Sequence, residues 1–184
     1  MSLVLYDYLP SGNGYKCRLV LKVLGMPYEL RQMDILHGAT RTPEYLAINA
    51  NGKIPVLVVE GREPIAESHA IIAYLAEGSA LVPADPYERA LMWQWMCFEQ
   101  YQLEPGVATV RFWLHSLHKT PQELGDRYTE RFQRGKDALA VLNGALAGRR
   151  WLVGESVSLA DYPAIVAWIA GFKRLPWYAP ITEP

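Results

Sequence analysis

The stretch NGKIPVLVVEGREPIAES, residues 51–68, contains the pattern that decides the fold. Asn51-Gly52 predicts a turn, and the apolar run from Pro55 to Val59 predicts a strand. A second turn then returns the chain as an antiparallel partner strand around Pro64-Ile65. Because proline has no N–H to donate to a sheet ladder, Pro55 indicates an edge strand, where an extended, peptide-like ligand could pair. Taken alone, the same residues also fit a plain turn into an edge strand.

Helices and strands alternate around this hairpin. The residue pattern predicts strands at 3–7 and 28–34, and helices at 14–24, 42–48 and 67–76. The resulting order, β-α-β-α-β-β-α, predicts a small mixed sheet with a parallel βαβ opening and an antiparallel hairpin at its far side. Residues 1–77 are therefore expected to form an α/β domain.

The rest of the chain predicts a linker and an all-α domain. Residues 78–86 carry two prolines and no helical stripe, which is typical of a linker, and strand signals are absent from 87–184. One long helix is expected from Tyr87 to about Leu117, kinked at Pro105-Gly106. A capping box with proline at the first helical position, Thr120 to Glu123, predicts a second helix. The apolar face expected for that helix consists of Leu124, Tyr128, Phe132, Leu139, Leu142 and Leu146.

Composition excludes several classes of protein. The chain has 184 residues, of which 51% are hydrophobic and 20% charged, so an ordinary folded protein is expected. A net charge of -1 gives no field that would attract nucleic acid or an anionic membrane. No secretion signal and no apolar run long enough to cross a bilayer are recognised, which favours a cytoplasmic protein. Cys17 and Cys97 are far apart, without metal-ligand spacing, and each is expected to be a packed apolar residue.

Polar residues lie where the first predicted strand meets the first predicted helix. The segment Pro10 to Lys16 includes Ser11 and Asn13, which place a hydroxyl and a carboxamide at a helix N-terminus. Such a position favours an anion, because the first backbone N–H groups and the helix dipole point toward it. A plain helix cap followed by flexible glycines is the alternative interpretation.

A second polar pair, Glu67-Ser68, opens the helix at 67–76. Backbone N–H groups and the Ser68 hydroxyl could take a carboxylate, and the Glu67 side chain could take an ammonium group, as an α-amino acid terminus requires. The pair could instead simply cap the helix. Between the two helix starts, a cis Ile54-Pro55 bond would present the backbone of Ile54 outward.

Together these segments resemble the cytosolic glutathione transferase family, and the resemblance covers nearly the whole chain. It implies a thioredoxin-like N-terminal domain followed by an all-α domain. It also implies that Pro55 is cis, that Ile54 pairs with the cysteinyl backbone of glutathione, and that Glu67 and Ser68 hold the γ-glutamyl end. Glutathione would then be the co-substrate, with no metal required.

The start of the chain is similar to bacterial, zeta-like and theta-like members, which use a serine hydroxyl. The resemblance assigns Ser11 to the glutathione sulfur and Asn13 to a second polar contact with it. It assigns the glycine carboxylate to Lys53, ahead of His37, Thr40 and Arg41. A free thiol has a pKa near 8.5, so a hydrogen bond from Ser11 and the helix dipole would activate it by stabilising the thiolate.

The activity that this resemblance implies is transfer of glutathione to a small apolar electrophile, a detoxification reaction, by a homodimer. Tyr101 and Trp113 are candidates for the wall of the electrophile cleft. Two alternatives stay open. The pattern of Pro10, Asn13, Gly14 and Lys16 is similar to bacterial members that reduce disulfides with glutathione, and a non-catalytic binding protein could keep the same scaffold. The identity of the electrophile is not predicted.

The chain departs from the family near its end. Ser158 to Asp161 is similar to the family's capping box before the central helix of the all-α domain, but Tyr162-Pro163 follows at once. Roughly twenty residues, about the length of a helix and a loop, are missing by this comparison. Proline at the fifth position of a helix would disrupt it, so Pro163 is expected to start its own helix. The all-α domain is therefore expected to be shortened, which bears on activity and dimerisation.

Overall fold

The computed structural model describes residues 2–162, which divide between Glu77 and Gly78 into two compact units. The first unit contains a mixed sheet and the second is helical. Among these residues, no helix is long and apolar enough to cross a membrane.

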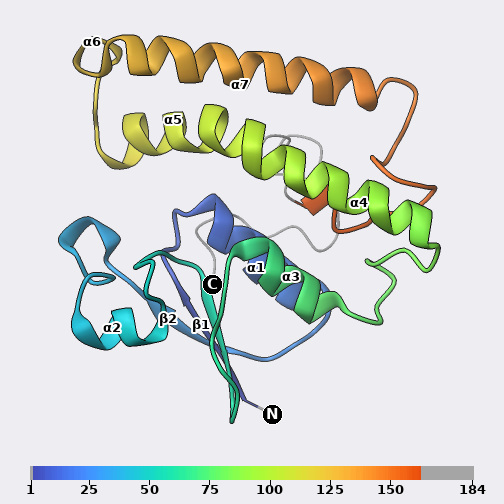
Figure 1. Cartoon of the computed structure of the whole chain (residues 1–184), viewed down its shortest axis with the longest axis horizontal. Coiled ribbons are helices and arrows are strands. Elements are labelled where there is room, and N and C mark those ends of the chain that lie inside the picture. Colours follow the sequence, from blue (N-terminus) through green and yellow to red (C-terminus); the bar gives the residue numbers. More distant parts are fainter. Residues whose placement is uncertain (1, 163–184) are drawn as a thin grey trace. The chain divides into compact units, whose positions relative to one another are not determined.

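The first unit confirms the predicted order of elements. Its four strands are arranged β2-β1-β3-β4, with β1 parallel to β2 and antiparallel to β3, and β3 antiparallel to β4. Helices α1 and α3 pack against each other on one face of the sheet, and α2 lies on the other side (Figure 1). The elements are β1 (Leu3–Asp7), α1 (Gly12–Val23), β2 (Glu29–Gln32), η1 (Ile35–His37), α2 (Pro43–Ile48), β3 (Val56–Val59), β4 (Ile65–Ala66) and α3 (Ser68–Ala76).

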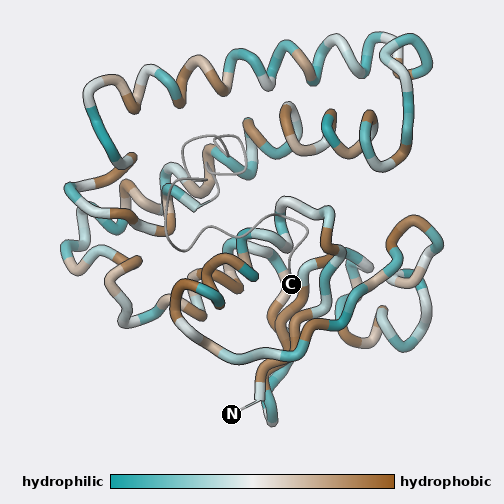
Figure 2. Tube along the Cα trace, turned by 180° about the vertical axis from the view of Figure 1, so that it is seen from behind, coloured by the Kyte–Doolittle hydropathy of each residue, from teal (hydrophilic) through white to brown (hydrophobic). Residues whose placement is uncertain are grey.

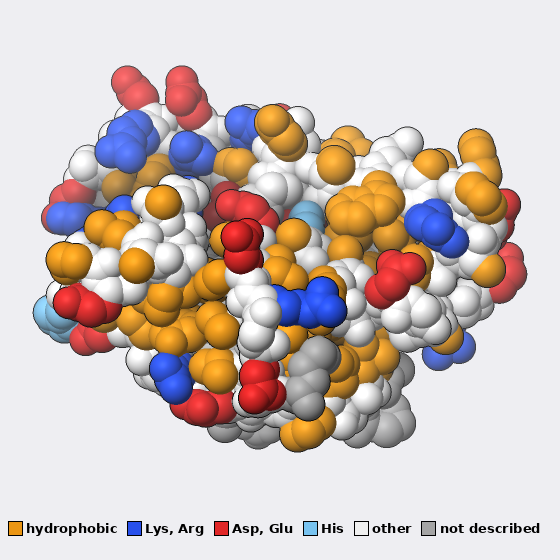
Figure 3. Space-filling model, turned by 60° about the horizontal axis from the view of Figure 1, so that its bottom comes forward, with side chains coloured by type: hydrophobic (Ala, Val, Ile, Leu, Met, Phe, Trp, Pro, Cys, Tyr) orange, Lys and Arg blue, Asp and Glu red, His pale blue; other side chains and the backbone are white. Residues whose placement is uncertain are grey.

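The core of this unit forms where the sheet meets α1 and α3. Leu5 of β1, Leu57 of β3 and Ile71 of α3 are fully buried. Strands and helices around them are mostly brown in Figure 2, which marks hydrophobic residues. Alternate residues of β1 face this core, and the pattern ends on Asp7, a buried carboxylate. Acidic and basic side chains are interspersed among hydrophobic ones on the face of the molecule shown in Figure 3.

In the second unit a helical rod runs from Pro86 to Ser116 beside α7 (Figure 1). Pro105, where a kink was predicted, lies inside a stretch of π-type turns. Proline lacks the N–H that an α-helix needs at that position, so wider turns around it fit the missing donor. The rod consists of α4 (Pro86–Phe98), η2 (Glu99–Ala108), α5 (Thr109–Arg111) and η3 (Phe112–Ser116).

The predicted helix after Thr120 is two helices, α6 (Pro121–Leu124) and α7 (Asp126–Ala145). Gly125 separates them with a φ of 56°. The apolar face predicted for this segment is also partly wrong, because Phe132 of α7 is exposed and stacks on Tyr128. The face that α7 buries includes Gly135 instead, and a Cβ there would lie 2.6 Å from the carbonyl oxygen of Gly106. Two glycines thus allow the backbones of α7 and η2 to approach closely.

Toward the end of the described residues, the Asp161 carboxylate accepts hydrogen bonds from the backbone N–H groups of Ser158 and Leu152, both at 2.9 Å. The Asp161 side chain therefore closes the loop between these residues. The predicted helix start at Pro163 lies outside the described residues.

Candidate functional site

Ser11 caps α1, which begins two residues before the predicted start. The Ser11 N–H donates to the carbonyl of Tyr8 at 2.7 Å, and this turn presents the side chain at the end of the helix. The Ser11 Oγ accepts a hydrogen bond from the backbone N–H of Gly14 at 3.2 Å. Because a hydroxyl can donate and accept at once, Ser11 can still donate its own proton to an anion at this helix N-terminus.

Asn13 and Ser68 are brought together although 55 positions separate them in the sequence. The Ser68 Oγ lies 3.5 Å from the Asn13 Oδ1, the long end of the hydrogen-bond range. Cys17, one turn further along α1, is buried and directs its thiol toward the Ser68 carbonyl at 3.8 Å. The N-termini of α1 and α3 are therefore neighbours, and predicted residues from both helices meet there.

Glu67 has a backbone conformation that its residue type does not predict. Its φ is 69° and its ψ is 119°, a region that L-residues rarely adopt. A residue held there costs about 1–3 kcal/mol, and such residues cluster at functional sites. The exposed Glu67 side chain makes no capping hydrogen bond to α3. Glu67 therefore occupies the N-cap position of α3 without capping the helix through its side chain.

The Ile54-Pro55 peptide bond is cis. The prediction that Pro55 opens an edge strand is wrong. Strand β3 is internal, because it pairs with β1 on one side and β4 on the other. The β1 ladder runs as far as the Tyr6–Val56 pair and the β4 ladder as far as the Val56–Ala66 pair. Ile54 therefore lies just beyond both ladders, and pairing with an extended ligand would be local to this residue.

The backbone before this bond is held by two side chains of the α2 region. The Lys53 carbonyl accepts hydrogen bonds from the Tyr45 hydroxyl and the Asn49 amide, both at 2.8 Å. Burial of Tyr45 raises the pKa of its hydroxyl to about 12, so it stays a donor at neutral pH. These two donors fix the chain where it enters the cis bond.

The four candidates for a carboxylate contact differ in what already occupies them. His37 pairs with Asp34 at 2.7 Å, and this hydrogen bond lowers the pKa of the Asp34 carboxyl. Arg41 donates to the carbonyl of Asn51 at 3.1 Å, and Thr40 is buried. Lys53 is exposed and forms no ion pair within residues 2–162. The structure thus leaves Lys53 as the most available cation of the set.

The two cysteines have different surroundings. Burial raises the pKa of the Cys17 thiol to about 12, which keeps it protonated. Cys97 is exposed on α4, so its prediction as a packed residue is wrong. Within the described part of the chain, no group of three or more His, Cys, Asp or Glu side chains could hold a metal ion.

In the helical unit, the two predicted wall residues have different surroundings. Tyr101 of η2 is 72% exposed. The ring of Trp113 lies 5.2 Å from the guanidinium carbon of Arg127 and 5.7 Å from that of Arg131. A ligand that stacked on Trp113 would therefore compete with these cations of its own unit.

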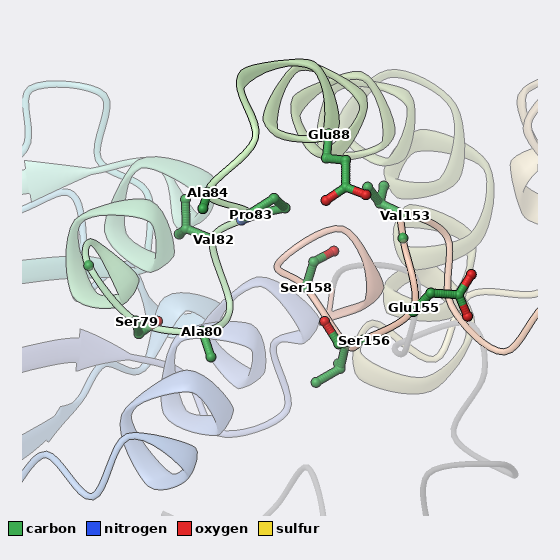
Figure 4. A pocket seen from close by; sticks show the side chains of 13 residues that line it. Ser79, Ala80, Val82, Pro83, Ala84, Glu88, Val153, Glu155, Ser156 and Ser158 are labelled. Carbon is green, nitrogen blue, oxygen red and sulfur yellow. The ribbon is translucent and has the colours of Figure 1, made fainter.

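A pocket of about 410 Å³ also lies in the helical unit, between the linker, α4 and the loop at 153–158 (Figure 4). Glu88 points from α4 toward Val153, and the hydroxyl of Ser158 is already bonded to Asp161 at 3.3 Å. All the predicted glutathione contacts belong to the other unit. None of the residues that line the pocket is therefore a predicted glutathione contact.

Both units match models of one protein family. Residues 1–77 match the glutathione S-transferase N-terminal domain, and residues 90–178 match the glutathione S-transferase C-terminal domain. The chain belongs to the glutathione S-transferase family. The predicted resemblance and fold class are thereby confirmed.

Three similar proteins illustrate the range of this family. The disulfide-bond oxidoreductase YfcG of Escherichia coli K12 is 34% identical over 88% of this chain and 78% of its own length. A zeta-class glutathione S-transferase of Euphorbia esula is 32% identical over 93% of this chain and 78% of its own length. A glutathione S-transferase structure from Pseudomonas fluorescens superimposes with a TM-score of 0.90 at 37% identity, with both chains fully covered.

Proposed function

We propose that this glutathione S-transferase family member binds glutathione at the adjacent N-termini of α1 and α3 and uses its thiolate to attack a small apolar electrophile. The observation that carries this proposal is the geometry of Ser11, whose hydroxyl accepts from Gly14 and retains a proton to donate. Two helix N-termini also converge there, through the Ser68–Asn13 contact. Both features favour an anion.

Each part of glutathione has a proposed partner in the sheet-bearing unit. Ser11 and Asn13 hold the sulfur, and the backbone of Ile54, before cis Pro55, pairs with the cysteinyl residue. Ser68 and Glu67 hold the carboxylate and ammonium groups of the γ-glutamyl end, and Lys53 the glycine carboxylate. The position of Ile54 just beyond both ladders supports the backbone pairing.

The chemistry that Ser11 supplies is stabilisation of charge. A hydrogen bond from a hydroxyl to a thiolate, together with the helix dipole, lowers the thiol pKa by about one to two units. The thiolate then forms a bond to the electrophilic carbon, the leaving group departs with its electron pair, and the thiol proton passes to solvent. Ser11 acts as a hydrogen-bond donor and not as a nucleophile, since among residues 2–162 no base is hydrogen-bonded to its hydroxyl.

Disulfide reduction is the second candidate, favoured by the similarity to YfcG and by the pattern of Pro10, Asn13, Gly14 and Lys16. In that reaction the bound thiolate attacks one sulfur of a disulfide, which releases a thiolate and leaves a mixed disulfide. A second glutathione thiolate then attacks the mixed disulfide to give glutathione disulfide and the second thiol. Because Cys17 is buried with a raised thiol pKa, the protein supplies no nucleophilic sulfur from that position.

Parallel assays separate these candidates. The purified protein is given glutathione with a chloro-nitrobenzene acceptor in one assay and with hydroxyethyl disulfide in the other. Conjugation activity supports the transferase, and activity on the disulfide alone supports the second candidate. Silence in both assays with retained glutathione binding would reject both and identify a binding protein.

We also propose that the protein is a cytoplasmic homodimer whose conjugation reaction serves detoxification, as the resemblance to the family implies. An isologous two-fold interface is the commonest form of homo-oligomer. Light scattering at micromolar concentration should give the mass of two chains. A monomeric mass would reject the dimer and leave the glutathione site unaffected.

A further inference from the structure

A buried ion pair lies directly below the turn that presents Ser11. Asp7, the last residue of β1, and Arg18, on the second turn of α1, are both almost completely buried. The Arg18 Nη1 donates to the Asp7 Oδ2, and the Nη2 donates to the carbonyl of Leu9 at 2.9 Å. One guanidinium therefore holds the end of the strand and the middle of the turn that follows it.

This pair is linked to Ser11 at both ends of the turn. The Tyr8 carbonyl, next to the Leu9 carbonyl held by Arg18, accepts the Ser11 N–H at 2.7 Å. On the other side, the Asp7 carboxylate lies against Gly14, where an added Cβ would fall 1.6 Å from the Asp7 Oδ1. Gly14 in turn donates its N–H to the Ser11 hydroxyl. Any shift of Asp7 or Arg18 would therefore be transmitted to the cap of α1.

The charges around the pair determine the electrostatic environment of an anion bound at Ser11. Burial lowers the pKa of Arg18 to about 10, and the charge interaction with Tyr28 opposes this shift, so the guanidinium remains a cation at neutral pH. The Tyr15 ring lies 5.8 Å from the guanidinium carbon of Arg18. Lys16 is the other cation of this part of α1, and it is buried. Arg18 donates a hydrogen bond to the Asp7 carboxylate, and a carboxylate deprived of this cation would oppose any anion bound at Ser11.

We propose that Arg18 is a positioning residue for the thiolate site, where it holds the Tyr8–Ser11 turn and neutralises the Asp7 carboxylate beneath it. The inference rests on the proposed function, since it requires glutathione at Ser11. It assigns to a buried ion pair the task of presenting a neutral surface to the sulfur. A purely structural pair would stabilise the fold without acting on the bound thiol.

The test is a comparison of two variants with opposite charge effects, Arg18→Gln and Asp7→Asn. Ultraviolet titration of thiolate absorbance in the glutathione complex gives the pKa of the bound thiol. Arg18→Gln should raise that pKa by about one unit, because the Asp7 carboxylate loses the guanidinium that donates to it, and Asp7→Asn should lower it, because the substitution removes a negative charge from beneath the site. Affinity for S-methylglutathione should change less than about threefold in each, which reports that the rest of the site is intact.

Arg31→Gln is the matched control, because Arg31 of β2 also pairs with an acid, Glu29, but on the surface. It should leave the thiol pKa unchanged. Shifts of the same sign in Arg18→Gln and Asp7→Asn, or no shift in either, would overturn the inference. If thermal melting shows that one variant is unfolded, the sign of the shift in the other decides. A wild-type protein that binds no glutathione would instead reject the proposed function itself.

Discussion

The helix starts at Ser11 and Thr120 use the same capping geometry for different purposes. Thr120 has Glu123 at the third helical position, and each side chain bonds the other's backbone, at 3.2 and 2.7 Å. Its hydroxyl also donates to the Glu123 carboxylate at 3.1 Å, so the Thr120 hydroxyl proton is already used. Ser11 has Gly14 at the third position, whose backbone N–H donates to the Ser11 hydroxyl and which has no side chain to bond the Ser11 backbone in return.

The comparison shows that a strong helix-start signal and a binding site have opposite requirements. A reciprocal cap satisfies two backbone N–H groups of the helix and, at Thr120, leaves the cap hydroxyl without a proton for a ligand. Glycine at the third position of α1 keeps the Ser11 proton available and makes room for the Asp7 carboxylate below. A weak cap in the sequence is thus what an anion site at a helix N-terminus needs.

Gly14→Ala tests the Ser11 helix start and should have the largest effect, on the free energy of unfolding. The new Cβ would overlap the Asp7 carboxylate, which must move and abandon Arg18. Breaking a buried ion pair costs about 3–5 kcal/mol of unfolding free energy. Gly144→Ala in α7 is the control, because a Cβ there would meet no other element of residues 2–162 within 4 Å, and it should stabilise the protein by about 0.5–1 kcal/mol. Urea unfolding measures both, and equal stabilities would contradict the proposed packing.

Glu67→Gln should come next in size and should act on binding. The substitution keeps the shape and the positive φ of the residue but removes its charge, so the γ-glutamyl ammonium loses its partner. Glutathione affinity measured by calorimetry should weaken by about 1.5–3 kcal/mol. Glu63→Gln, a nearby exposed carboxylate, should leave the affinity unchanged. Unchanged affinity in Glu67→Gln would remove this residue from the site.

Thr120→Ala should cost about 1 kcal/mol of stability, since it removes the cap hydroxyl of α6. It should leave glutathione affinity at the wild-type value, because the residue lies in the other unit. Chemical unfolding and calorimetry on one preparation test both statements. A loss of glutathione affinity would show that the two helix starts are not independent.

The smallest effect concerns pH at the α6 cap. Hydrogen bonds from Thr120 lower the pKa of Glu123 below its ordinary value near 4.5. A depressed carboxyl pKa contributes stability above the unfolded-state value and loses it as pH falls through the folded-state value. Stability should therefore decline slightly more steeply below pH 4.5 in wild type than in Glu123→Gln. The same dependence of stability on pH below 4.5 in the two proteins would contradict the lowered pKa of Glu123.

Local signals in the sequence were enough for the order of elements and for the strongest cap. The turn at Asn51-Gly52, the apolar runs and the Thr120 box each act within a few residues, and the structure contains all of them. The same reasoning misplaced the buried face of α7. Phe132 fits the apolar period, but the helix packs through Gly135, where two backbones approach.

The site was predicted less completely, because its geometry depends on tertiary contacts. Ser11, Asn13 and Ser68 could be proposed from their places at helix starts, but the Asn13–Ser68 contact spans 55 positions. No residue type signals the positive φ of Glu67, and β3 could be recognised as internal only once β1 and β4 were seen on both sides of it. The Asp7–Arg18 pair was missed because a charged residue at the end of a strand is ordinarily exposed.

The central claim is that the Ser11 hydroxyl stabilises the glutathione thiolate, and Ser11→Ala tests it most directly. Ultraviolet titration of the glutathione complex should show the thiol pKa raised by about one unit or more, while thermal melting of the free protein shows a loss of about 1 kcal/mol. A titration midpoint that stays in place in Ser11→Ala and moves in Asn13→Ala would contradict the assignment of Ser11.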